Sequence, residues 1–149
     1  MYRFALLVIF VTLLTSSISQ AASYQLTSGA FVDPILNRSG VTHSYSGNNL
    51  EPGAILSYAR LTWAILDNAD LTGANLTDAS LYDANLDNAD LTGANLTDAN
   101  LYDANLYDAN LYDANLTYAI LYDANPTDAN PTNANLSNAN LYDANLSNA

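Results

Sequence analysis

The feature that most constrains this chain is a period of five residues. Alanine occurs at every fifth position from Ala54 to Ala149, and leucine follows two residues later in nearly every repeat. On an α-helix, each step of five residues advances by about 140°, so the leucines would scatter round every face. On a flat strand, an odd period sends successive leucines to opposite faces. The chain must therefore turn within each repeat.

The pattern inside the repeat indicates where it turns. Alanine and leucine are two residues apart, as same-side neighbours on an extended segment are, and a polar residue such as Asn75 points outward between them. Two residues that tolerate turns then follow, for example Thr77 and Asp78. A second period of twenty makes residues 71–90 resemble residues 91–110 and predicts four repeats per coil, although duplication of a twenty-residue unit would leave the same signal.

These quintets carry a family resemblance. Residues 74–78 (ANLTD) and 94–98 (ANLTD) follow the pattern A(N/D)LXX, which resembles the pentapeptide-repeat family over about two thirds of the chain. The resemblance implies an all-β fold, the right-handed quadrilateral parallel β-helix. In that fold, the central leucine and the preceding alanine fill the interior and the other three positions face outward. We expect about five coils over residues 54–149.

The first residues indicate export. Arg3 precedes an apolar run from Phe4 to Leu14, and small residues follow at the positions that a signal peptidase reads. We predict a signal peptide over residues 1–21, cleaved before Ala22. A membrane anchor is the alternative, but the run is shorter than the roughly twenty residues that span a bilayer. The expected location is secreted, periplasmic or another exported compartment such as a thylakoid lumen.

Residues 22–53 are expected to form an N-terminal cap. Stepping back by five from the repeats gives Glu51 and Ser46, which break the apolar pattern, and then four apolar residues that restore it. These are Val41, Leu36, Phe31 and Leu26. The cap is therefore either a degenerate first coil or an irregular segment that shares the spacing by chance.

The charge balance excludes one class of partner. Fifteen acidic residues face three arginines, lysine is absent, and the net charge is −12. Nucleic acids are bound through clustered lysine and arginine, so no nucleic-acid partner is expected. The acidic surface is compatible instead with a protein partner, a cation or mimicry of a polyanion. The absence of cysteine excludes disulfide bonds.

Four repeats per coil would place residues twenty apart in columns. One column of tyrosines is a candidate interaction surface, although stacking alone would also stabilise the coils. A neighbouring column of aspartates is a weak candidate for cation binding, with a solvated acidic face as the alternative, because one carboxylate per coil supplies few of the oxygens that calcium needs. The tyrosines are Tyr82, Tyr102, Tyr122 and Tyr142, and the aspartates are Asp83, Asp103, Asp123 and Asp143.

No enzyme chemistry is indicated. The sole histidine is His43, in the cap region, and the sequence places no evident nucleophile or second base with it. We therefore expect neither an active site nor a cofactor.

The sequence favours an exported, non-enzymatic structural or protein-interaction module whose partner is an unknown protein or envelope component, with no membrane span after signal cleavage. The alternatives are a cation-binding surface protein and a DNA-mimicking, gyrase-binding protein, which the resemblance implies for some family members.

The C-terminal coil suggests end-to-end self-association or a truncated chain. Pro126 and Pro131 occupy leucine positions and represent either a tolerated defect or a functional notch.

Overall fold

The computed structural model describes residues 24–25, 31–32 and 50–149. Two short strands, β1 (Tyr24–Gln25) and β2 (Phe31–Val32), pair antiparallel. The predicted signal peptide, its cleavage site, His43 and most of the predicted cap lie outside the described residues. The division of the chain at residues 21 and 53 therefore stays a prediction.

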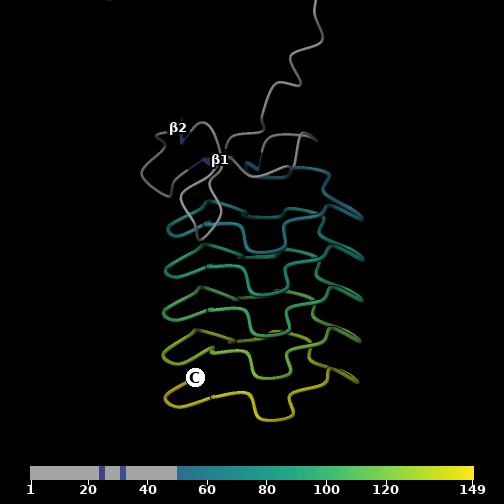
Figure 1. Ribbon diagram of the computed structural model, residues 1–149, viewed down its shortest axis with the longest axis vertical. Coiled ribbons are helices and arrows are strands. Elements are labelled where there is room, and N and C mark those ends of the chain that lie inside the picture. Colours follow the sequence, from purple (N-terminus) through teal and green to yellow (C-terminus); the bar gives the residue numbers. More distant parts are fainter. Residues whose placement is uncertain (1–23, 26–30, 33–49) are drawn as a thin grey trace, which may run out of the picture.

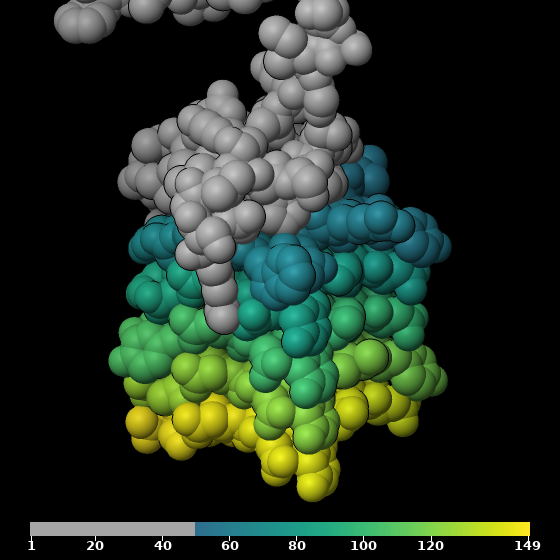
Figure 2. Space-filling model, in the orientation of Figure 1, coloured from purple at the N-terminus to yellow at the C-terminus, as the bar shows by residue number. Residues whose placement is uncertain are grey.

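Residues 50–149 form a stack of four-sided coils (Figure 1). Each outward residue of one coil pairs in parallel with the residue twenty positions later, from Ile55 with Asn75 to Ile120 with Asn140. The space-filling view shows successive coils in direct contact along the stack (Figure 2). The twenty-residue period thus corresponds to one coil, which confirms the four-sided β-helix that the sequence predicted.

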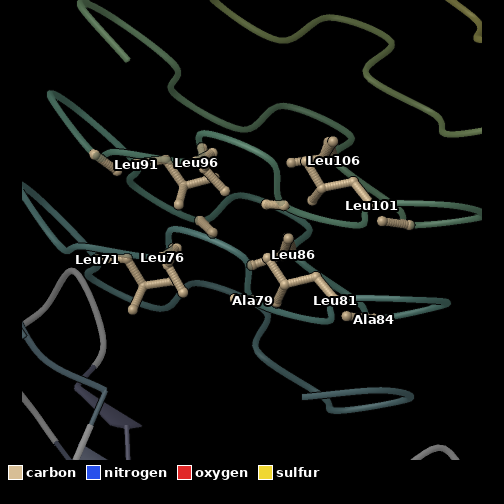
Figure 3. Packing of buried hydrophobic residues seen from close by; sticks show 14 of the residues in the cluster. Leu71, Leu76, Ala79, Leu81, Ala84, Leu86, Leu91, Leu96, Leu101 and Leu106 are labelled. Atoms are coloured by element: carbon tan, nitrogen blue, oxygen red, sulfur yellow. The ribbon is translucent and has the colours of Figure 1, made fainter. Parts of the chain in front are cut away.

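The interior of the stack is a column of leucine and alanine side chains. Leucines of one coil lie over those of the next, as Figure 3 shows for Leu71 and Leu91 or Leu76 and Leu96. From Leu56 to Leu121 the central leucines are almost completely buried. Every fifth residue therefore faces the interior, because the backbone bends at each corner.

Burial differs from the expectation at the two ends of the described coils. Leu50 is buried in the core although it lies one position before the expected slot, and Glu51 in that slot is exposed. A carboxylate cannot enter an apolar core without a partner, so its leucine neighbour fills the position. In the last coil, Leu146 is 46% exposed because no described residue packs on its outer side.

Every corner is a tight turn closed by one hydrogen bond. The alanine N–H donates to the leucine carbonyl three residues earlier, as Ala79 does to Leu76 at 3.0 Å. The residue before the alanine has a positive φ, 57° at Asp78 and 66° at Gly73. Asparagine, aspartate and glycine adopt this conformation at lowest cost, which explains the composition of the turns.

Most of the other backbone amides bond between coils. In the inner coils, the outward residue donates to the alanine carbonyl of the preceding coil, and the leucine and the turn residue donate to the following coil. Examples are Asn95 to Ala74 (2.9 Å), Leu96 to Asn115 (2.7 Å) and Asp98 to Thr117 (3.0 Å). Each inner coil is thereby bonded to both of its neighbours.

The two prolines are accommodated within this pattern. Pro126 is buried in its leucine slot, and its carbonyl still accepts from Ala129 at 3.1 Å. Proline has no N–H for the carbonyl of Asn145, which instead accepts from the Thr127 hydroxyl at 3.5 Å. The bonds on either side persist, which favours the tolerated defect over a notch.

Among the described residues, no helix is long and apolar enough to cross a membrane.

Candidate protein-interaction surface

The outward residue between alanine and leucine has a structural role that the sequence pattern did not reveal. Its side-chain oxygen accepts the backbone N–H two residues later, as Asn95 does from Thr97 at 3.1 Å. Asn100 does the same for Tyr102, and Asn140 for Tyr142, each at 3.1 Å. This side chain caps the corner and is half-buried in most coils rather than simply pointing outward.

The asparagine amide nitrogens also link successive coils. Asn105 donates to the side-chain oxygen of Asn85 at 3.0 Å and accepts from Asn125 at 3.2 Å. On another side, Asn115 donates to the Thr97 hydroxyl at 3.0 Å. An aspartate could cap the corner equally well but could not donate, so the cross-coil bonds explain the preference for asparagine.

The four tyrosines of the predicted surface form one continuous stack. Their ring centroids are 5.2, 4.9 and 5.2 Å apart from Tyr82 to Tyr142, with interplanar angles of 14°, 10° and 12°. We call this set (Tyr82, Tyr102, Tyr122, Tyr142) the tyrosine column. Each inner ring is covered on both faces, so the column presents ring edges and hydroxyl groups to solvent.

The aspartate column (Asp83, Asp103, Asp123, Asp143) follows the tyrosine column at the adjoining corner. Desolvation and the neighbouring carboxylates of Asp103 and Asp143 raise the pKa of Asp123. The pKa of Tyr122 is also raised, first by the charge of Asp123. The charges of the two columns are therefore coupled where Tyr122 adjoins Asp123.

The aspartate column does not form a closed metal centre. Among the described residues, no group of three or more histidine, cysteine, aspartate or glutamate side chains could hold a metal ion. Successive carboxylates lie one coil apart, about 4.7 to 4.9 Å along the stack. Each position therefore offers too few oxygens for the six to eight that calcium takes.

Three large apolar residues on the same side of the stack add to the exposed surface beside the tyrosine column and were not singled out from the sequence. Trp63, Tyr118 and Ile120 are all exposed. Trp63 precedes the aspartate column by one coil, and Ile120 lies two residues before Tyr122. Their signal was present in the sequence, because each breaks the turn or capping composition of the repeat.

The repeats match the Pentapeptide repeats family in eight copies, over residues 54–93, 94–130 and 126–149. The chain belongs to this family, and its fold is the family's right-handed quadrilateral β-helix. Proteins of this family generally serve as structural or interaction modules. The sequence matches no curated protein.

Solved structures of the same family resemble this one. A pentapeptide repeat protein from the Arabidopsis thaliana thylakoid lumen is 32% identical, with a TM-score of 0.62 over 64% of this chain and 66% of that protein. The protein Rfr23 from the cyanobacterium Cyanothece 51142 is 36% identical, with a TM-score of 0.40 over 58% of this chain and 60% of its own. The present chain thus spans less than two thirds of either protein.

Proposed function

We propose that this chain is an exported, non-enzymatic protein-interaction module that binds its partner through the tyrosine and aspartate columns. The observation that carries the proposal is the continuous stack of four tyrosines beside a column of carboxylates. Export is supported by the apolar N-terminal segment and by a related protein from a thylakoid lumen.

The two columns have the properties of a recognition surface. Stacked rings are held in place before binding, so little side-chain entropy is lost when a partner contacts them. Tyrosine supplies both apolar area and a hydroxyl group, and it is enriched among residues that dominate binding energy. The carboxylates add charge complementarity and select a partner with basic groups.

The dimensions of the coil limit how the partner binds. Five coils at about 4.8 Å each make one side of the stack only about 24 Å long. A stable interface buries about 800 Å² per partner, more than one narrow side offers. The partner is therefore expected to extend over an adjoining side as well.

A competition experiment tests the proposal. The purified chain is immobilised and exposed to the extracellular or lumenal fraction in which the mature protein is found, and retained proteins are quantified. We expect the unmodified chain to compete for a saturable partner, and the Tyr102→Ser/Tyr122→Ser variant to compete far more weakly. Tyr112→Ser, on the opposite side of the coil, serves as the control that should compete normally. Equal competition by all variants would contradict the proposal.

Two alternatives give different results in simple assays. Inhibition of DNA gyrase supercoiling by the chain, together with retention in the cytoplasm, would favour a DNA-mimicking protein. Saturable heat on titration with calcium would favour a cation-binding surface. If the chain binds a protein partner through the tyrosine column, neither gyrase inhibition nor saturable calcium binding is expected.

A further inference from the structure

Tyr118 occupies a position where its residue type is unfavourable. It has a φ of 60°, in the left-handed region that bulky side chains rarely adopt. At the same corner of the neighbouring coils stand Asp98 and Asn138, which adopt this conformation at lower cost. The Tyr118 side chain is nonetheless 56% exposed, so burial of the ring does not compensate for the backbone cost.

Ile120 breaks a second local rule two residues later. In the adjacent coils, Asn100 and Asn140 cap the following corner by accepting the N–H of Tyr102 and Tyr142. Isoleucine has no oxygen for the N–H of Tyr122, and residues 50–149 show no other acceptor for it. Ile120 is 40% exposed and therefore recovers little from burial.

Together with Tyr122, these residues lie two positions apart along one side of the coil, at the edge of the tyrosine column. We call Tyr118, Ile120 and Tyr122 the 118–122 patch. Asp98 precedes Tyr118 by one coil, and Asp123 adjoins Tyr122 and raises its pKa. Arg60 is the one basic side chain in residues 50–149 and lies three coils away.

We propose that the 118–122 patch is the anchor of this interface and packs against an apolar surface bordered by lysine or arginine on a partner protein. The inference rests on the interaction function proposed above. Two successive departures from the local rules, both exposed, are typical of a surface kept for contact rather than for stability. The carboxylates of Asp98 and Asp123 beside the patch favour lysine or arginine at the rim of the partner's surface. A second copy of this chain is disfavoured as the partner, because two chains that each carry a net charge of −12 repel one another.

A defined peptide tests the inference while the partner itself is unidentified. The probe is a fluorescent twelve-residue peptide of alternating leucine and lysine, titrated against the full chain by anisotropy at physiological salt. We expect the Tyr118→Asn/Ile120→Asn variant to bind about tenfold more weakly than the unmodified chain, since loss of an anchor commonly costs this much. Tyr112→Asn, a tyrosine with 39% exposure on another side, should leave the affinity unchanged.

A second measurement separates binding from folding. Asparagine at 118 suits the positive φ, and asparagine at 120 restores the cap on Tyr122, so the thermal midpoint of Tyr118→Asn/Ile120→Asn should rise. A higher midpoint with weaker peptide binding supports the inference. A lower midpoint would overturn the premise that these residues reduce stability.

The other possible results also support or overturn the proposed anchor. A peptide with serine in place of leucine should bind poorly, and equal binding would mean that charge alone is recognised. Loss of binding in Tyr102→Ser/Tyr122→Ser but not in Tyr118→Asn/Ile120→Asn would overturn the anchor and leave the proposed function intact. Binding unaffected by either variant would reject both. A dimer of the unmodified chain that Tyr118→Asn/Ile120→Asn abolishes would identify a second copy as the occupant and overturn the basic partner.

Discussion

At the scale of single residues, the corners decide which side chains this coil accepts. A positive φ at each corner selects asparagine, aspartate or glycine, and in this chain the choice is often aspartate. Successive coils then place equal charges at the same corner, as at Asp103, Asp123 and Asp143. The geometry that stabilises each turn thereby creates a repulsive column.

Asp123 should therefore destabilise the fold when it is ionised. Its pKa is raised above the ordinary value of 3.8, chiefly by desolvation and then by the carboxylates of Asp103 and Asp143. The folded state binds this proton more tightly than the unfolded state, so its contribution to stability falls as the pH rises from about 3.8 and stays low at neutral pH. We expect Asp123→Asn to raise the thermal midpoint at pH 7, and the gain to disappear at about pH 3.

Asp113→Asn is the matched control for this prediction. Asp113 has nearly the same φ, 56° against 55° for Asp123, but its column neighbours are Gly93 and Asn133. Its replacement reports only the difference between aspartate and asparagine in the turn. An equal, pH-independent gain in both variants would attribute the effect to turn propensity rather than to the aspartate column.

At the scale of a repeat, the asparagine side chain stabilises both the corner of its own coil and the contact with the neighbouring coil. One oxygen caps the corner of its own coil, and the amide nitrogen bonds to the neighbouring coil, as Asn105 does with Tyr107 and Asn85. The corner and the stacking are therefore stabilised by the same residue.

Asn105→Asp separates these two roles. The aspartate keeps the cap on Tyr107 but cannot donate to Asn85, so we expect a loss of about 0.5–1.5 kcal/mol in the free energy of unfolding, measured by urea denaturation at neutral pH. Asn75→Asp is the control, because Asn75 caps Thr77 and donates no cross-coil bond within residues 50–149. Equal losses in both variants would show that the added charge, not the missing bond, is responsible.

The sequence predicted the coil better than the surface. The five-residue and twenty-residue periods are geometric, so they determine which residues face inward and which stack, including the tyrosine column. The capping by asparagine depends on the backbone angles of the corner, which spacing alone does not contain. Tyr118 and Ile120 depart from the composition of the repeat in the sequence, but only the φ at 118 and the missing acceptor for Tyr122 show what these departures cost.

At the scale of the whole molecule, each coil contacts only the coils before and after it. Stability in such a stack is the sum of the coils and the contacts between neighbours. Leu101 lies on the same side of the stack as Leu121 and Leu141, but Leu101 is fully buried between two coils, whereas Leu141 is half-buried. The cost of a defect should therefore depend on its position along the stack.

Leu101→Ala should cost far more than the same substitution in the last coil. Truncation at a central, fully packed position is expected to cost about 2–5 kcal/mol, because a cavity forms that the hydrogen-bonded coils on both sides cannot close. Leu141→Ala, in the half-buried position, should cost much less. Urea denaturation gives both values, and amide hydrogen exchange in Leu101→Ala should accelerate most in the coils next to residue 101. Equal losses at both positions, or acceleration spread evenly along residues 50–149, would mean that the stack unfolds as one unit, without the neighbour-by-neighbour coupling that its architecture implies.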